Sequence, residues 1–572
     1  MTAETETLGT LRRRNGLRPQ HLGWRILILG VICPLTLAPI ITLLVLALSA
    51  DPAIWAHLAA TILPGATLRT LGLLIGVGVL TGIIGVATAW LVAMCRFPGR
   101  GVFEWLLLLP LAMPTYIIAY AYVEILDYVG PVQSTLRDLF GWTSPRDYWF
   151  PEIRSLGGAI FLFAFVLYPY VYLTTRATFL MQSMCVIDVS RTLGRSAWTS
   201  FFQVALPLAR PGIVVGITLV SMEALNDIGA VEYLGVNTLT LSVYSTWVNR
   251  GDLGAAAQIA CVMLLFVIAL IWLERRGRRM QRFHHTSRRI QALPDHPLSG
   301  WRAAAAVLVC TAPVIIGFLI PAALLTEFAA SRFSSNYGPQ FWVLVRNSLM
   351  VSAVAACVAV LIGLLLTYSA RLTGSGTLVA AGRLSSIGYA VPGTILAIGT
   401  LVPMAALDNA VDGAMRSVLG VSTGLILTGT IAALVYAYVV RFLAVSYGAL
   451  EAGLQRVTPH LDMASRSLGR TAAGTLREVH LPMLRPAVAT AMILVFVDSM
   501  KELPATILLR PFGFDTLATH VYTYASLARV ENGALAALAI VAVGLLPVAL
   551  LAYTSRLPMR MMAAGGGKGA SG

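Results

Sequence analysis

The sequence predicts an all-α polytopic membrane protein with about twelve transmembrane helices, arranged as two parallel six-helix halves. Of the 572 residues, 57% are hydrophobic and only 12% are charged, and the mean hydropathy is +0.78. A soluble protein with a wetted surface does not have this composition. Apolar runs of about 20 residues recur along the chain. Helices are expected because every backbone polar group inside a bilayer must be satisfied within its own segment.

The apolar runs can be taken in order along the chain. The expected spans are roughly 24–49, 70–94, 104–126, 157–180, 211–230, 253–273, 303–325, 345–370, 383–407, 421–446, 484–500 and 533–555. If the chain starts inside, most of its 41 Lys and Arg residues fall on the inner side, which is the bias of cytoplasmic loops. The formal net charge of +15 is therefore interpreted as topology, with both termini cytoplasmic, and not as a nucleic-acid-binding surface.

The first span follows basic residues, as a secretory signal does, but residues 24–49 are longer than a signal core and favour a retained helix. The six cysteines lie in or beside the helices without paired spacing. They are expected to be apolar packing residues, with neither a disulfide nor a metal role.

One polar segment occurs twice. Residues 190–195 (SRTLGR) lead to Pro207, and residues 465–470 (SRSLGR) lead to Pro482, with the same spacing between glycine and proline in both copies. Two further pairs recur at nearly the same offset along the chain: Met113-Pro114 with Val391-Pro392, and Thr70 with Ser348. Six spans separate the two copies, so both copies face the same side, as in a parallel repeat.

This repeat divides the chain. The expected segments are an N-terminal tail and first helix (1–65), a first transmembrane domain (66–273), a basic cytoplasmic linker (274–302), a seventh helix with an outer loop (303–341), a second transmembrane domain (342–555) and a disordered cytoplasmic tail (556–572). The linker is interpreted as a solvated basic segment at the lipid surface. His284 and His285 within it are weak evidence for a metal site.

The duplicated segment has the composition of a short helix lying across the inner membrane face. Pro207 and Pro482 fix φ near the boundary, and Pro211 and Pro486 suit a first helical turn. An ordinary interfacial helix with snorkelling Arg would explain one copy. It does not explain the same spacing twice, which favours a lever moved by a soluble motor.

These segments resemble the EAA loop of binding-protein-dependent ABC importer permeases, a MetI-like family, and are closest to the fused two-half ferric iron permeases. The pattern is Glu-Ala-Ala, three residues, Gly, nine residues, Ile, one residue, Leu-Pro. The resemblance implies a coupling helix in each half that docks on a cytoplasmic ABC ATPase, and hence two ATPase copies. The residues that it assigns to coupling are Asp188, Ser190, Arg191, Gly194 and Pro207 in the first half, and Asp462, Met463, Ser465, Arg466, Gly469 and Pro482 in the second.

The two copies differ at the acidic position of the motif. Asp188 keeps the charge, whereas the second half has Met463, with Asp462 one residue earlier. If that acidic residue pairs with an Arg on the motor, the second half couples through Asp462 or couples more weakly.

Residues 501–511 (KELPATILLRP) resemble the ferric branch of the same family, and residues 226–230 (NDIGA) are their counterpart in the first half. The residues expected in the substrate pathway are Glu223, Asp227, Asp498, Lys501 and Glu502. Charged residues at membrane depth usually line a pathway, and carboxylates suit a hard trivalent cation. The alternative is structural pairing of Lys501 with Asp498 or Glu502. Phenols that could assist are Tyr116, Tyr120, Tyr168, Tyr170 and Tyr172, for which packing is the favoured interpretation.

No catalytic constellation is evident, and no metal site is assigned. Residues 565–569 (GGGKG) lack the Ser or Thr and the strand–helix context of a phosphate loop. ATP and Mg²⁺ are therefore expected on partner subunits. The sequence is thus expected to encode the permease of an ATP-driven importer in a bacterial inner membrane, receiving ferric iron from a periplasmic binding protein. Thiamine, polyamine or phosphonate cargo, and a twelve-helix secondary transporter, are the alternatives.

Overall fold

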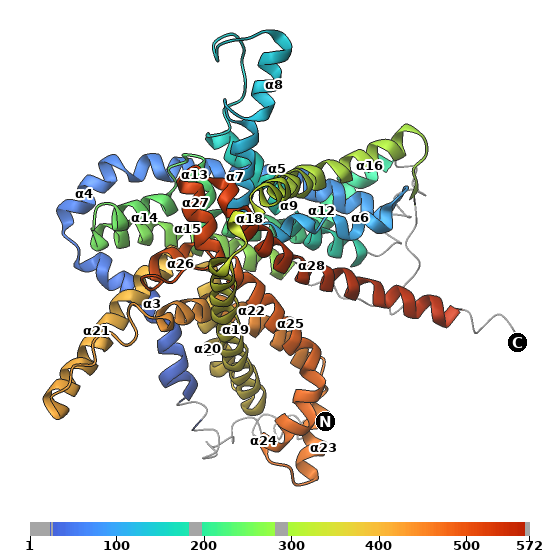
Figure 1. Ribbon diagram of the computed structural model, residues 1–572. Helices are drawn as coiled ribbons and strands as arrows, with labels where there is room; N and C mark the ends of the chain where they lie inside the picture. The colour runs from blue at the N-terminus through green and yellow to red at the C-terminus, as the bar shows by residue number, and fades with distance from the viewer. Residues whose placement is uncertain (1–22, 24–26, 182–196, 281–295, 567–572) are drawn as a thin grey trace, which may run out of the picture.

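The computed structural model describes residues 23, 27–181, 197–280 and 296–566, and these residues are almost entirely helical (Figure 1). The exception is a two-residue parallel pairing of β1 (Cys95–Arg96) with β2 (His296–Pro297). The predicted all-α fold class is confirmed. Among the described residues, eleven helices are long and apolar enough to cross a membrane, or twelve if one bent pair is counted as a span.

The first half contains the elements up to Met280. They are η1 (Ile28–Ile32), α3 (Cys33–Ser49), α4 (Pro52–Thr61), α5 (Leu63–Met94), α6 (Arg100–Leu106), η2 (Leu109–Ala112), α7 (Thr115–Leu126), α8 (Pro131–Phe140), α9 (Leu156–Met181), α11 (Ala197–Ser200), η3 (Phe201–Ala205), α12 (Leu206–Asn226), α13 (Gly229–Tyr233), α14 (Leu239–Val248) and α15 (Leu253–Met280).

The second half begins at Trp301. Its elements are α16 (Trp301–Val314), η4 (Ile315–Leu319), α17 (Ile320–Ser331), α18 (Phe333–Asn336), α19 (Pro339–Thr373), α20 (Gly376–Ser385), η5 (Ser386–Ala390), α21 (Gly393–Leu419), α22 (Ile431–Gln455), α23 (Pro459–Ser467), α24 (Ala472–Thr475), η6 (Leu476–His480), α25 (Leu481–Met500), α26 (Pro504–Leu509), α27 (Leu517–Ser526) and α28 (Val530–Gly566).

The expected third span is broken. The segments Arg100–Ala112 and Thr115–Phe140 meet at an angle of 88°. Pro114 precedes α7 with φ −59° and ψ 140°, and Pro392 precedes α21 with φ −54° and ψ 143°. Proline fixes φ and removes a backbone donor, so the chain leaves the helix at these points. The same break therefore stands at the same place in both halves.

A hydrogen bond repeated in the two halves confirms the internal duplication at atomic level. The Leu239 amide donates to Thr70 Oγ1 at 3.0 Å, and the Leu517 amide donates to Ser348 Oγ at 2.8 Å. In both bonds the donor and the acceptor are separated by 169 residues along the chain. The contact fixes the start of α14 on α5 and the start of α27 on α19.

The first and seventh spans each pack against a helix of the opposite half. Gly399 of α21 packs so closely on α3 that a Cβ atom there would lie 2.0 Å from the Pro39 carbonyl oxygen. Gly317 of η4 approaches α9 in the same way, with the Phe165 carbonyl oxygen at 2.2 Å from an added Cβ. Each peripheral span therefore packs on the opposite half and holds the two halves together.

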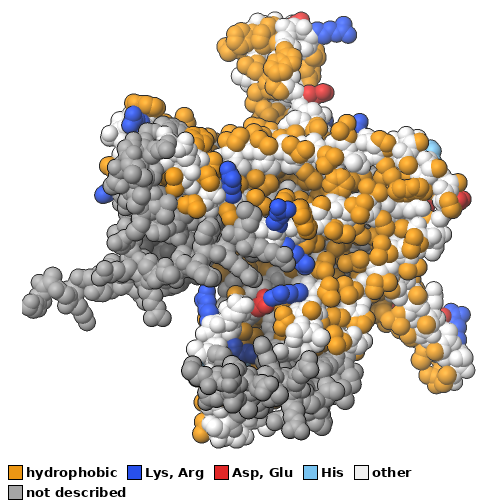
Figure 2. Space-filling model, turned by 180° about the vertical axis from the view of Figure 1, so that it is seen from behind, with side chains coloured by type: hydrophobic (Ala, Val, Ile, Leu, Met, Phe, Trp, Pro, Cys, Tyr) orange, Lys and Arg blue, Asp and Glu red, His pale blue; other side chains and the backbone are white. Residues whose placement is uncertain are grey.

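Apolar side chains cover the face seen in Figure 2, and basic residues gather along part of it. Large apolar residues on the long helices are solvent-accessible in the isolated chain, for example Leu68 at 72% and Ile75 at 64%. Outward apolar side chains of this kind are what a lipid-facing helix presents.

Several expected boundaries differ from the structure; the ninth span, expected at 383–407, is Gly393–Leu419, and the eleventh, expected at 484–500, is Ala472–Met500. The tail expected to be disordered from residue 556 is helical to Gly566, because its Met and Ala residues continue α28. The tenth span was expected at 421–446 but runs from Ile431 to Gln455, because Gly420, Gly424 and Gly429 have positive φ and form a loop. Of the expected linker, residues 281–295 lie outside the described residues.

Candidate functional site: a charged cavity between the halves and the coupling segments

A cavity of about 100 Å³ lies where the two halves meet. All five side chains expected in the substrate pathway line it: Glu223, Asp227, Asp498, Lys501 and Glu502. They come from the ends of α12 and α25 and from the turns that follow. Because these two helices are repeat equivalents, the duplication brings acidic residues from matching positions of the two halves onto one small space.

Glu502 is the most completely satisfied of these carboxylates. Its Oε1 accepts from Arg441 Nη1 at 2.7 Å and from the Ala505 amide at 2.9 Å. Its Oε2 accepts from the Thr506 amide at 3.0 Å and from Thr506 Oγ1 at 2.5 Å. A carboxylate has about four acceptor positions, so Glu502 is fully occupied as the N-terminal cap of α26 and as the partner of Arg441.

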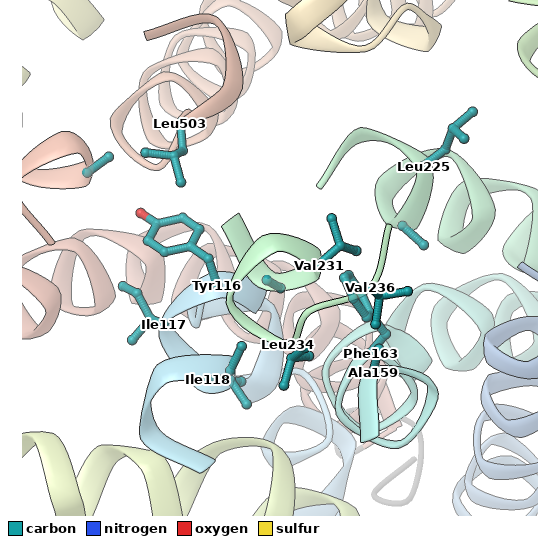
Figure 3. Packing of buried hydrophobic residues seen from close by; sticks show 14 of the residues in the cluster. Tyr116, Ile117, Ile118, Ala159, Phe163, Leu225, Val231, Leu234, Val236 and Leu503 are labelled. Carbon is teal, nitrogen blue, oxygen red and sulfur yellow. The ribbon is translucent and has the colours of Figure 1, made fainter. Parts of the chain in front are cut away.

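Asp227 does the same for α13 in the first half. Its Oδ1 accepts from the Ala230 amide at 2.7 Å, and its Oδ2 accepts from Thr115 Oγ1. Figure 3 shows α13 packed through Val231 and Leu234 beside Ile118 of α7 and Phe163 of α9. The cap and this packing fix the short helix, so Asp227 has a structural role whatever else it does.

Arg441 belongs to the cavity, although a tenth span at 421–446 would put this residue near the inner end of its helix. It lies on α22, with only 9% of its side chain exposed, and its Nη1 pairs with Glu502. The equivalent position in the first half is Val166, which also lines the cavity. The three glycines before α22 could have indicated the position of Arg441 from the sequence, because they form a loop and the helix starts only at Ile431.

The two halves contribute charge unequally. Lys501 corresponds to Asn226 in the first half, and Asn226 Oδ1 accepts from the Gly393 amide at 2.8 Å. Both cationic side chains of the cavity, Arg441 and Lys501, thus come from the second half. Four carboxylates face two cations, a formal excess of two negative charges.

The remaining two acids are less occupied. Glu223 Oε1 accepts from the Tyr389 hydroxyl at 2.8 Å, a bond that joins α12 to η5 across the halves. Asp498 Oδ1 lies 2.9 Å from Lys501 Nζ, with 25% of the Asp498 side chain exposed. The structural pairing of Lys501 with Asp498, which was the alternative to a pathway role, is therefore present at the cavity wall.

The tyrosines separate into two groups. Tyr116 and Tyr170 line the cavity. Tyr120, Tyr168 and Tyr172 are buried among apolar side chains, and the Tyr172 hydroxyl donates to the Glu104 carbonyl oxygen. Packing is thus the role of these last three.

The first coupling segment lies mostly outside the described residues, which exclude Asp188, Ser190, Arg191 and Gly194. Pro207 is described and stands in the first turn of α12. In the second half α23 is followed by a turn at Gly469, whose φ is +76°, and then by α24. Gly can adopt this φ without strain. Pro482 is in the first turn of α25, as Pro207 is in α12.

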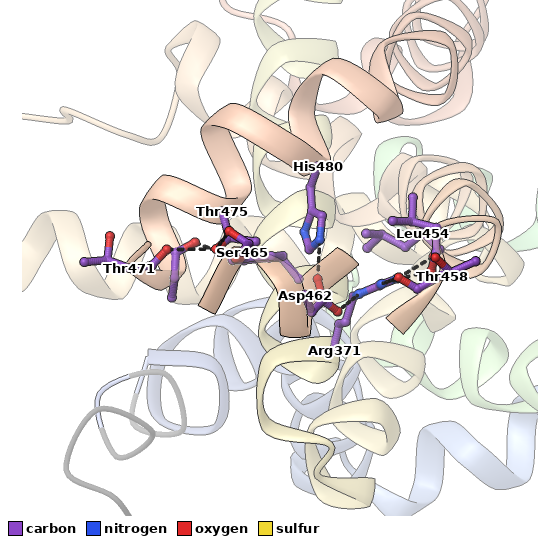
Figure 4. A network of polar contacts seen from close by, with 11 residues as sticks. Arg371, Leu454, Thr458, Asp462, Ser465, Thr471, Thr475 and His480 are labelled. Atoms are coloured by element: carbon purple, nitrogen blue, oxygen red, sulfur yellow. Dashed lines mark hydrogen bonds and ion pairs between the residues drawn. The ribbon is translucent and has the colours of Figure 1, made fainter. Parts of the chain in front are cut away.

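Asp462 faces inward and joins three elements, as Figure 4 shows. Its Oδ2 lies 2.9 Å from Arg371 Nε of α19, and its Oδ1 contacts His480 Nε2 of η6. Arg371 also donates to the Leu454 and Val457 carbonyl oxygens at 2.6 and 2.9 Å. Both Asp462 oxygens are engaged within the chain, so Asp462 ties α23 to the transmembrane helices.

Met463 and Ser465 point in different directions from this network. Met463 is 56% exposed, whereas Ser465 is buried and its Oγ lies 2.8 Å from Thr475 Oγ1. The acidic position of the motif therefore presents an uncharged, exposed side chain in the second half. A one-residue shift on a helix turns the side chain by about 100°, so Asp462 and Met463 face different surroundings, and coupling through Asp462 or weaker coupling both stay predictions.

Comparison with known proteins agrees with this architecture. Residues 81–282 match the family of binding-protein-dependent transport system inner membrane components. The Fe(3+)-transport system permease protein of Haemophilus influenzae is 25% identical over 472 residues, which are 82% of this chain and 85% of that protein. A ferric transport system permease protein of Actinobacillus pleuropneumoniae is 23% identical over 489 residues, 80% of this chain and 65% of its own length.

A shorter relative fits within one half. The molybdenum transport system permease protein of Escherichia coli is 29% identical over 204 residues, which are 34% of this chain but 86% of that protein. A unit of this length agrees with the duplication seen in the fold. The family match in residues 81–282, together with the similarity to ferric permeases over about four fifths of the chain, supports a multi-pass permease subunit of an ABC importer.

Proposed function

We propose that this permease carries ferric iron across the inner membrane, from a periplasmic binding protein into the cytoplasm. The observation that carries the proposal is the central cavity, where four carboxylates face two cations. Carboxylate and phenol oxygens are hard ligands suited to a small, highly charged cation. The permeases named for ferric iron match about four fifths of this chain, which supports the same cargo.

A cargo of oxyanions is the rival that the relatives raise, because permeases named for molybdenum and sulfate match about a third of this chain. An excess of negative charge in a small, poorly hydrated space repels an anion. The charge of the cavity thus supports a cation.

Energy would come from two copies of a cytoplasmic ABC ATPase, since no ATP-binding motif is found in the sequence and the chain has two coupling segments. The described segment, α23 to α24, is tied to α19 through Asp462 and Arg371. A push on it would therefore reach α19 and α25 as a rigid unit. Both termini are proposed to be cytoplasmic, and ATP and Mg²⁺ to bind the partner subunits only.

The test is the ATPase activity of the reconstituted complex in nanodiscs with purified periplasmic binding proteins. A ferric-loaded binding protein is expected to stimulate hydrolysis, and its iron-free form is expected to do so less. Stimulation only by a molybdate- or sulfate-loaded protein would remove the iron assignment but keep the importer.

A further inference from the structure

Lys501 is an unusual residue for this chain. The sequence has 41 Lys and Arg residues, of which only Lys501 and Lys568 are lysines. Lys501 lines the cavity, and its ammonium lies 2.9 Å from Asp498 Oδ1. Lys carries a compact charge on a flexible stem, whereas Arg holds carboxylates in a rigid fork. A cationic side chain that must leave its carboxylate partner is therefore better supplied by Lys than by Arg.

The fixed cation of the cavity is Arg441, and the contrast with Lys501 is plain. Arg441 pairs with a carboxylate whose four acceptor positions are all filled. Lys501 pairs with Asp498, for which the described residues provide this one ion pair, and Glu223 faces the same cavity with its hydrogen bond from Tyr389. The oxygens free to bind a ligand thus gather around Lys501.

An independent observation in the same cavity, on its Asp227 and Glu502 side, points to a missing ligand. The Tyr116 hydroxyl has no hydrogen-bond partner within the described structure, although Tyr116 is only 4% exposed and lines the cavity. A buried hydroxyl without a partner is costly. Figure 3 shows the Tyr116 ring extending from α7 toward Leu503, the residue after Glu502. Water or a ligand that fills the cavity would give this oxygen a partner.

We propose that Lys501 is a tethered counter-ion: its ammonium occupies the site formed by Glu223 and Asp498 when the cavity is empty, and a hard multivalent cation displaces it. The inference rests on the proposed function. The exchange breaks an ion pair and forms metal–oxygen contacts, with no covalent step. The displaced ammonium then competes for the same carboxylates and promotes release of the cargo.

The first test measures Tb³⁺ binding to the full-length chain in nanodiscs, by terbium emission sensitised by nearby tyrosines. Lys501→Met is expected to tighten Tb³⁺ binding by roughly tenfold or more, the effect of removing one unit charge a few ångströms away. Lys501→Arg, which keeps the charge, should bind no tighter than the unmodified chain. Glu223→Gln and Asp498→Asn should bind more weakly.

Glu531→Gln serves as the matched control, because Glu531 is an exposed carboxylate that pairs with Arg332 away from the cavity. It should leave the sensitised emission unchanged. An unchanged Tb³⁺ affinity in Lys501→Met, or a loss in Glu531→Gln as large as that in Glu223→Gln, would overturn the proposal.

The second test needs no variant, because the chain has only two lysines. Reductive methylation with ¹³C-formaldehyde labels Lys501, Lys568 and the terminal amine. Diamagnetic La³⁺ is expected to shift the Lys501 dimethylamine signal in the NMR spectrum and to leave the Lys568 signal in place. Equal behaviour of the two signals would contradict a displaced ammonium.

The transport function and the tethered counter-ion fail in different experiments. If the complex moves iron from its binding protein while Lys501→Met keeps the Tb³⁺ affinity of the unmodified chain, the tethered counter-ion is wrong and the transport function stands. If Lys501→Met tightens Tb³⁺ binding but iron is not transported, the cation site stands and the cargo assignment is wrong.

Discussion

The buried pair of Arg441 and Glu502 allows the sharpest prediction about stability. Only 1% of the Glu502 side chain and 9% of the Arg441 side chain are exposed, and the atoms of the pair lie 2.7 Å apart. Glu502→Gln leaves the guanidinium buried without its counter-ion, which costs about 3–5 kcal/mol when one partner of such a pair is removed. It also places an amide donor near the Ala505 and Thr506 amides that Glu502 caps.

The reverse substitution is expected to cost less. Arg441→Met leaves Glu502 with three of its four hydrogen bonds, so the loss is about 1.5–3 kcal/mol, the range for one hydrogen bond to a charged group. The double variant should be more stable than Glu502→Gln alone, because it removes the uncompensated cation. Asp227→Asn is the matched control in the first half: Asn is a good N-cap and Val166 replaces the arginine there, so its cost should be about 1 kcal/mol or less.

The assay is unfolding of the purified chain in mixed SDS–detergent micelles, followed by the fluorescence of its 11 tryptophans. The four variants give a double-mutant cycle for the pair together with its first-half control. Strict additivity of Glu502→Gln and Arg441→Met, or a cost of Asp227→Asn equal to that of Glu502→Gln, would refute the reasoning.

Three further predictions concern coupling, packing and the loop between α8 and α9. Asp462→Asn should loosen the coupling segment of the second half from the transmembrane helices, so that the ATPase activity stimulated by the binding protein falls several-fold. Met463→Gln should keep an activity near that of the original chain. Equal losses in both variants would argue against an internal role for Asp462. Gly399→Leu should separate the first span from α21, because a Cβ there lies 2.0 Å from the Pro39 carbonyl oxygen. Its thermal stability should fall more than that of Gly413→Leu, where an added Cβ meets nothing within 4 Å. Hydrogen bonds from the Thr143 and Ser144 amides lower the pKa of Asp147 below its ordinary value, so this carboxylate stabilises its loop above about pH 4 and the effect is lost as the pH falls through the lowered pKa. The fluorescence of Trp142, stacked on Tyr148, should change at that acid transition in the original chain and not in Asp147→Asn, and a transition that persists in the variant would assign it to another group.

The sequence was sufficient for the features that depend on composition and spacing. Hydropathy predicts the spans because a bilayer admits only satisfied backbones, and the constant offset of the repeat brings Asp227 and Glu502 to equivalent places at the cavity. The hydrogen bonds of Thr70 and Ser348 to the amides of Leu239 and Leu517 follow from the same repeat. These features are local or periodic, so one sequence contains them.

Other features depend on three-dimensional direction and could not be read from spacing. Arg441 lies deeper in its helix than the expected span implies, because a loop of positive-φ glycines precedes α22 and the helix starts at Ile431. Asp462 and Met463 are neighbours in sequence, yet the helical turn of α23 points the first toward Arg371 and leaves the second exposed. The capping roles of Asp227 and Glu502 require the helix breaks that follow them, and a carboxylate in a cap looks in sequence like a carboxylate in a pathway.

The central claim, that cargo crosses through the charged cavity between the halves, is tested most directly by ATP-dependent uptake of ⁵⁵Fe into proteoliposomes containing the complete complex and a ferric-loaded binding protein. The double variant Glu223→Gln and Asp498→Asn should lower uptake at least tenfold while the complex still assembles and hydrolyses ATP, and Glu531→Gln should transport as the original chain does. Uptake of ⁵⁵Fe that is undiminished in the double variant would contradict a pathway through this cavity.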